Sequence, residues 1–123
     1  MNVLVDTSVW VDHFRKRNAA LVSLIELDLV TTHPMVIAEL ACGTPPAPRA
    51  KTLGLLQLLR QVKEASLDEV MAFIEREKLY GLGCGLVDLV FLASTLMTPG
   101  TRLWTLDKRL ADLAGRLSVA YRP

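Results

Sequence analysis

Short apolar runs alternate with longer helical segments along the whole length of this 123-residue chain. The strand-like runs are residues 1–5, 29–32, 61–65, 102–106 and 118–121. The helical segments between them are residues 7–17, 18–28, 35–42, 49–60, 66–79, 86–97 and 108–117. Strands that alternate with helices are typical of a parallel sheet covered by helices on both faces. We therefore expect one α/β domain over residues 1–123, because the chain has the length of a single domain and shows no internal repeat.

Capping and helix-breaking residues set the ends of several of these helices. Pro34 suits a first helical position, and Gly43 is placed to end the helix that follows it. Ser66 and Glu69 have the spacing of a capping box at the start of segment 66–79. The leucines of segment 49–60 cover more than one helix face, so they either enter the core or meet a partner.

The net charge is only +1, so the chain as a whole does not attract nucleic acid, and any contact with it must come from a local basic patch. Cys42 and Cys84 lie far apart, and neither belongs to a paired motif, which argues against a zinc site. We expect both to be small, mostly buried free thiols in a reducing cytoplasm. No signal peptide is evident, and the most apolar helix, 86–97, is too short for a membrane span and contains Asp88. A cytoplasmic location is therefore expected.

Four of the acidic residues occupy positions that need an explanation. Asp6 and Asp107 each follow the end of a predicted strand, at the edge where open α/β sheets bind their ligands. Glu39 and Asp88 each lie within an apolar helical run, where a carboxylate needs a cation, a donor or access to water. Taken singly, the two aspartates after strands are also explained as helix N-caps, and Glu39 as part of a solvated helix face.

The chemistry changes if the four carboxylates converge on one cleft. Several carboxylates cannot share a site without a counter-charge, and Mg²⁺ or Mn²⁺ is the natural partner of oxygen ligands without His or Cys. Such a site supports metal-assisted hydrolysis of phosphodiester bonds by an activated water. No histidine or lysine is obviously placed to act as a general base.

The sequence resembles the PIN-domain ribonucleases and, among them, the VapC-type toxins of bacterial type II toxin–antitoxin modules. Four segments in order carry the resemblance: VDTSVW at 5–10, IAELACG at 37–43, GLVD at 85–88 running into LAS at 92–94, and LWTLDKRL at 103–110. Each motif is weak alone, but the four together cover essentially the whole chain. The resemblance implies a Rossmann-like α/β/α sandwich, dependence on Mg²⁺ with Mn²⁺ as a substitute, and endonucleolytic cleavage of tRNA or rRNA. It also implies inhibition by a VapB-type antitoxin and assembly as a homodimer.

The resemblance also gives roles to individual residues. Asp6, Glu39 and Asp88 match the acids that hold metal in the family. Asp107 matches a fourth catalytic acid, whose position and role vary most. The remaining matches are polar positions beside the metal, where hydroxyls hold ligands or water or simply cap helices: Thr7, Ser8 and Thr105.

Basic side chains near the motifs are candidates for binding RNA phosphates. Arg15 belongs to a cluster after the first motif, and Lys108 and Arg109 directly follow Asp107. Solvated helix ends explain the same residues, although the helix dipole does not favour cations at the start of segment 108–117. Trp10 either stacks on a base or belongs to the core, as its helical spacing favours.

Two other functions are compatible with part of this pattern. A housekeeping PIN-domain nuclease that processes RNA or DNA would share the fold, although no extra nucleic-acid module is attached. A phosphoacceptor receiver domain is also α/β and acidic with Mg²⁺. That fold needs an acidic pair beside its first strand, whereas the acids here lie at the first strand, a late strand and two helices.

Overall fold

The computed structural model describes residues 1–123 and contains a four-stranded parallel sheet in the order β3-β2-β1-β4. The strands are β1 (Asn2–Val5), β2 (Val30–Thr32), β3 (Arg60–Gln61) and β4 (Thr101–Trp104). Leu4 of the central strand β1 pairs with Thr31 on one side and with Leu103 on the other. The predicted α/β class with a parallel sheet is confirmed.

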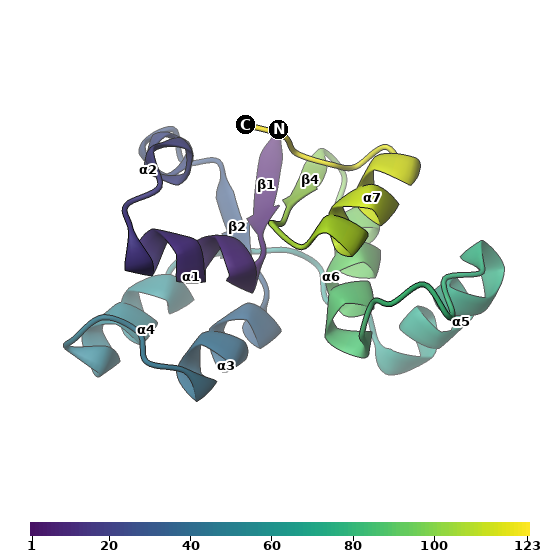
Figure 1. The fold of residues 1–123 in the computed structure, drawn as a ribbon, viewed down its shortest axis with the longest axis horizontal. Helices are drawn as coiled ribbons and strands as arrows, with labels where there is room; N and C mark the ends of the chain where they lie inside the picture. Colours follow the sequence, from purple (N-terminus) through teal and green to yellow (C-terminus); the bar gives the residue numbers. More distant parts are fainter.

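Seven helices surround the sheet, and Figure 1 shows α7 in front of β4 and α6 behind it. Their bounds are α1 (Thr7–Arg15), α2 (Ala19–Glu26), α3 (Pro34–Cys42), α4 (Arg49–Gln57), α5 (Leu67–Glu77), α6 (Leu86–Met97) and α7 (Lys108–Arg116). None of these helices is both long enough and apolar enough to cross a membrane.

The connections bring several helix starts to one edge of the sheet. Strands β1 and β4 are parallel and adjacent, so their carboxyl ends lie side by side. Helix α1 begins directly after β1, α7 begins shortly after β4, and α6 begins near the same edge (Figure 1). Residues at these strand ends and first turns are therefore brought together from distant parts of the sequence.

The core consists of β1 and the inner turns of the helices. Val3, Leu4 and Val5 have no exposed surface, and residues 89–95 of α6 are all buried. Helix α6 is thus enclosed on all sides over two turns, as its near-continuous apolar sequence predicts. Truncating its fully buried Phe91 to alanine is expected to cost about 3–5 kcal/mol.

All five predicted strands are shorter in the structure, and three of them differ most. Of the run predicted at 61–65, only Gln61 belongs to β3, and the Val62 N–H donates one further hydrogen bond to the Thr32 carbonyl oxygen. After Val62 the chain turns toward α6, where the hydroxyls of Thr98 and Ser94 accept hydrogen bonds from the backbone of Lys63 and Ala65. The predicted edge strand at 118–121 is reduced to a single parallel bridge between Ala120 and Leu103. The run at 102–106 leaves the sheet after Trp104.

The helix predictions are closer to the structure. The capping box is present, with Ser66 and Glu69 exchanging both of its hydrogen bonds at the start of α5. Pro34 occupies the first turn of α3, and Gly43 follows its end, although the backbone of Gly43 is extended rather than left-handed. The helix predicted at 49–60 ends at Gln57.

Candidate active site

Among the four candidate carboxylates, Asp6 accepts the most hydrogen bonds. It follows β1, caps the N-terminus of α1 and is only 5% exposed. Its Oδ2 accepts hydrogen bonds from the hydroxyls of Ser8 at 2.6 Å and Thr105 at 2.7 Å, and from the backbone N–H of Ser8 at 3.4 Å. Its Oδ1 receives no hydrogen bond and is not fully buried, so one oxygen remains available to a ligand.

Ser8 and Thr105 also hold the chain that leads from β4 to Asp107. The Ser8 hydroxyl accepts a hydrogen bond from the backbone N–H of Leu106, and the Thr105 hydroxyl accepts one from that of Asp107, both at 3.0 Å. These bonds explain why β4 ends at Trp104, since the next N–H groups are used by side chains. The two hydroxyls therefore fix Asp6 relative to the loop before α7.

Glu39 is oriented by the remaining predicted hydroxyl. It lies in α3 with an exposed side chain, and the Thr7 hydroxyl donates to its Oε1 at 2.5 Å. This bond joins the first turn of α1 to α3, and it is the direct structural link between the first two motifs. A hydrogen bond from a neutral hydroxyl leaves the negative charge of Glu39 uncompensated.

Asp88 lies in the first turn of α6, as the predicted bounds of this helix require, so it is near the helix start rather than in the middle of the apolar run. It is the third helical residue, and its Oδ2 accepts one long hydrogen bond, at 3.4 Å, from the backbone N–H of Gly85. Its place near the positive end of the helix dipole gives it an ordinary structural role that a mid-helix position would not. Burial raises the pKa of Asp88, the Gly85 bond opposes this, and the charges of Asp6, Asp107 and Glu39 raise it further.

Asp107 is exposed and caps α7 through a hydrogen bond that its Oδ1 accepts from the N–H of Leu110 at 2.9 Å. The helix-cap interpretation is therefore correct for both Asp6 and Asp107. A cap uses part of a carboxylate, and the free oxygen and the charge remain available. Lys108 and Arg109 occupy the first turn of α7 and are exposed, as predicted.

The four carboxylates act on one another without a cation from the protein. The charges of the other three raise the pKa of Asp88, and Asp6 and Asp107 follow adjacent parallel strands, so the four carboxylates lie near one another. The two salt bridges of the molecule join Arg60 to Asp28 and Arg76 to Glu77, and neither includes any of the four. No three acidic, histidine or cysteine side chains stand close enough to ligate one ion without rearrangement. Uncompensated oxygen donors fit Mg²⁺ or Mn²⁺, with side-chain rotation required on binding.

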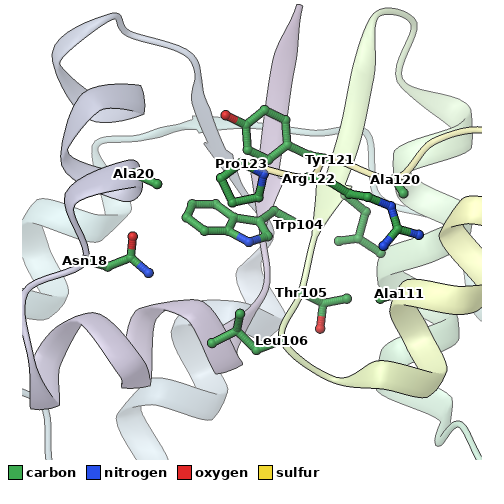
Figure 2. A pocket seen from close by; sticks show the side chains of 11 residues that line it. Asn18, Ala20, Trp104, Thr105, Leu106, Ala111, Ala120, Tyr121, Arg122 and Pro123 are labelled. Atoms are coloured by element: carbon green, nitrogen blue, oxygen red, sulfur yellow. The ribbon is translucent and has the colours of Figure 1, made fainter.

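Two hollows flank this site. One, of about 450 Å³, is lined by Arg15 and Glu39 together with Phe14 and the prolines after α3. The other, of about 430 Å³, lies over β4 beside Trp104 and the C-terminal residues 120–123, as Figure 2 shows. Thr105 and Leu106 line this second pocket, but none of the four acids does. Arg15 therefore shares a hollow with a predicted metal ligand.

Trp10 belongs to the core, so base stacking is the wrong interpretation. Its side chain is 4% exposed and packs near Phe14, with ring centroids 6.0 Å apart. The indole N–H is buried without a hydrogen-bond partner. A buried ring cannot offer its face to a nucleotide.

The glycine-rich loop at 80–85 is the part of the site whose role the sequence did not reveal. It carries the Gly85 N–H that contacts Asp88, and it carries Cys84. Burial raises the pKa of the Cys84 thiol, Asp88 and Asp107 raise it further, and Arg109 lowers it. The run of three alternating glycines was the available signal, but it did not show which residues the loop would contact.

Comparison with known proteins places this geometry in a family. The model of the family described as PIN domain matches residues 3–116, which include all four carboxylates. The chain belongs to the PIN-domain family. Two relatives, both named Ribonuclease VapC32, come from Mycobacterium tuberculosis strains CDC 1551 / Oshkosh and ATCC 25618 / H37Rv. Each is 43% identical over 118 residues, which cover 96% of this chain and 94% of the relative. The PIN-domain resemblance inferred from the four motifs is thus confirmed, and its VapC-type assignment is supported.

Proposed function

We propose that this PIN-domain protein is a Mg²⁺-dependent endoribonuclease and the toxin of a toxin–antitoxin pair. The observation that carries the proposal is that Asp6, Asp88 and Asp107 lie at the same edge of the sheet, with Glu39 joined to it through Thr7, while no salt bridge compensates any of the four acids. The two similar proteins named Ribonuclease VapC32 support RNA as the substrate. An acidic site repels phosphate unless a metal ion is present, so cleavage of RNA here requires a divalent cation.

Three carboxylates would hold the metal in this proposal: Asp6 through its free Oδ1, Glu39 and Asp88. Bound Mg²⁺, or Mn²⁺ in its place, supplies a counter-charge for the phosphate and lowers the pKa of a bound water. Ser8 and Thr105 keep the Asp6 carboxylate in one orientation, and Thr7 does the same for Glu39. Their role is to fix these acids in advance of binding.

Asp107 supports the site from its cap position. Its Oδ1 is committed to the Leu110 N–H, so we assign its other oxygen to a water or to the outer side of the metal site. Arg15 and Lys108 are the proposed contacts to RNA phosphates, and both are exposed. Arg15 shares a hollow with Glu39, which puts a positive charge on a path that leads to the carboxylates.

The proposed protein partners are a VapB-type antitoxin and a second copy of the chain. The leucines of segment 49–60 divide between the core and the surface. Leu56 is buried, whereas Leu55 and Leu58 are 57% and 81% exposed. These exposed leucines, one on α4 and one at its C-cap, are suited to an amphipathic segment of a partner. We assign this face to the antitoxin, and the homodimer stays a prediction.

A housekeeping PIN-domain nuclease is the remaining alternative, and a small antitoxin reading frame next to the gene would decide against it. Membership of the PIN-domain family leaves no support for a phosphoacceptor receiver domain. Incorporation of phosphate from a small phosphodonor would be needed to reopen that possibility.

The proposal is tested by brief expression followed by mapping of newly formed RNA ends, together with cleavage of the same RNA by purified protein. Cleavage should require Mg²⁺ or Mn²⁺, should stop in EDTA and should return when metal is added back. Co-expression of the neighbouring small protein should suppress both growth arrest and cleavage. Cleavage that continues unchanged in EDTA would contradict the proposal.

A further inference from the structure

Arg109 lies directly against the peptide of Gly83 in the glycine-rich loop. A Cβ placed on Gly83 would be 2.6 Å from Nη1, 2.8 Å from Cδ and 2.9 Å from Cζ of Arg109. The Arg109 Nη1 also donates a long hydrogen bond, at 3.5 Å, to the Gly83 carbonyl oxygen. The guanidinium can occupy this position only because residue 83 has no side chain.

This contact joins the two elements that carry Asp88 and Asp107. Gly83 lies two residues before Gly85, the N-cap of α6, whose N–H contacts Asp88. Arg109 lies in the first turn of α7, which Asp107 caps. Arg109, which follows Asp107, therefore holds the loop that precedes Asp88.

Arg109 is close to both acids without pairing with either. Arg109 lies two residues after Asp107, its Nη1 contacts the carbonyl of Gly83, and the charges of Arg109, Asp88 and Asp107 all shift the pKa of Cys84, the next residue of the loop. No salt bridge nevertheless joins Arg109 to a carboxylate. The guanidinium is directed to a backbone carbonyl, so both acids keep their charge for a cation.

We propose that Arg109 is a positioning residue, which fixes the start of α6 relative to α7 through Gly83 and thereby sets the separation of Asp88 and Asp107. The inference rests on the proposed metal-dependent ribonuclease and goes beyond it, because it replaces a phosphate contact at Arg109 by a contact within the protein. The planar guanidinium is essential to it, since a lysine ammonium does not pack flat on a peptide. Gly83 is equally essential, since any other residue displaces the guanidinium.

The loop contains a matched control for the substitution of Gly83. Gly81 and Gly83 have φ of +72° and +87°, so alanine introduces backbone strain at either position. A Cβ on Gly81 meets nothing within 4 Å, whereas one on Gly83 meets Arg109. A difference between Gly81→Ala and Gly83→Ala therefore reports the contact with Arg109 rather than the loss of a glycine.

The experiment compares Gly83→Ala, Gly81→Ala, Arg109→Ala, Arg109→Lys and the double variant Gly83→Ala/Arg109→Ala. Mn²⁺ affinity is measured by titration calorimetry without RNA, and kcat and KM are measured separately with a defined RNA. Gly83→Ala should weaken Mn²⁺ binding and lower kcat by about 10-fold to 100-fold relative to Gly81→Ala. Arg109→Ala should lower Mn²⁺ affinity and kcat as much as Gly83→Ala does, and Arg109→Lys should not recover either quantity. The double variant should have the same Mn²⁺ affinity and kcat as Arg109→Ala.

Several outcomes would overturn the inference. Equal Mn²⁺ affinity in Gly83→Ala and Gly81→Ala would remove it. So would an Arg109→Ala variant with unchanged Mn²⁺ affinity but a raised KM for RNA that Arg109→Lys restores, because that result identifies a phosphate contact. If the wild type neither binds Mn²⁺ nor cleaves RNA, the proposed function fails. Thermal unfolding of the same variants in EDTA then still tests the contact, since additive effects of the two substitutions would contradict it.

Discussion

Asp6 and Asp88 carry the same charge at the same edge of the sheet, but the protein treats them differently. Asp6 is almost fully buried, and its Oδ2 accepts two short hydroxyl bonds and one backbone bond. Asp88 is half-buried and accepts a single bond of 3.4 Å. Burial without matching donors raises the pKa of Asp88, and the neighbouring carboxylates raise it further. The protein thus supplies hydrogen-bond donors to the carboxylate of Asp6, whereas the carboxylate of Asp88 still needs a counter-charge.

The difference has a direct consequence for the protein without metal. The three hydrogen bonds that the Asp6 carboxylate accepts stabilise the fold. Ionised Asp88 opposes folding, because its charge is better solvated in the unfolded chain than among three other acids. A divalent cation removes this penalty, so metal binding and the stability of the start of α6 are coupled.

The largest expected effect is on catalysis, where the two acids should behave alike. Asp6→Asn and Asp88→Asn each remove one charge from the metal site, worth several kcal/mol at the transition state. RNA cleavage should therefore fall by about 100-fold to 1,000-fold in a single-turnover assay. Asp112→Asn is the matched control, since Asp112 is exposed on α7 and lies outside the four-acid site. Near-normal cleavage by a correctly folded Asp6→Asn variant would remove the proposed function.

A smaller effect is expected from the hydroxyl that holds Asp6. Thr105→Val removes the donor to Asp6 and the acceptor for the Asp107 N–H, so cleavage should fall by about 10-fold to 100-fold. Thr105→Ser keeps the hydroxyl and should recover most of the activity. Thr101, at the other end of β4, has a buried hydroxyl without a partner. Thr101→Val should therefore leave cleavage unchanged, and a loss equal to that of Thr105→Val would indicate a general packing defect.

The two asparagine substitutions should change the free energy of unfolding in opposite directions, which tests the difference between Asp6 and Asp88 directly. In EDTA at neutral pH, Asp6→Asn should lower the free energy of unfolding by about 1 kcal/mol. Asp88→Asn should raise it by up to about 1 kcal/mol. The folded-state pKa of Asp88 is raised, so the penalty is present above that pKa and disappears as the pH falls below it. Thermal unfolding of both variants at neutral and acidic pH measures these changes. Destabilisation by Asp88→Asn at neutral pH would contradict the assignment.

The elements that the sequence predicted well are those with strong local signals. Helix α6 has its predicted bounds, since Gly85 precedes its apolar run and Pro99 follows it. The capping box fixed the start of α5 in the same way. Strand ends were predicted less well, because they depend on partners elsewhere in the chain. The Lys63 N–H donates to the hydroxyl of Thr98, 35 residues away, instead of to a neighbouring strand. No sequence pattern around Lys63 indicates this partner.

In the candidate site too, single residues were predicted from local signals, whereas the contacts between them were not. The four acids and the three hydroxyls are visible in the motifs, because all but Glu39 lie at a turn or in the first turn of a helix, and Glu39 lies within an apolar helical run. The pairing between them is not visible. Ser8 and Thr105 meet at Asp6 because β1 and β4 are adjacent, and they are separated by 97 residues. The contact of Gly83 with Arg109 likewise depends on how α7 packs beside the loop, which local patterns do not encode.

The smallest expected effect concerns His33, which lies at the same edge and responds to acid in the opposite direction to Asp88. Burial lowers the pKa of His33, and the charge of Glu64 partly opposes this. Its Nδ1 accepts the N–H of Met35 at the start of α3, and its Nε2 is buried without a partner. The unfolded chain therefore takes up the proton first, and stability is lost as the pH falls below the unfolded pKa of about 6.5.

Acidification from pH 7.5 to 5.5 in EDTA should lower the free energy of unfolding of the wild type by up to about 1 kcal/mol. His33→Asn keeps a side-chain acceptor for the α3 cap and has no titratable ring, so its stability should change less over this range. The gain from Asp88→Asn is present above the raised pKa of Asp88 and is lost as the pH falls below it, so Asp88 changes the stability of the wild type with pH in the opposite direction to His33. Chemical denaturation of the three proteins at each pH separates the two contributions. A wild type and a His33→Asn variant with the same pH dependence would show that His33 is not the group that titrates.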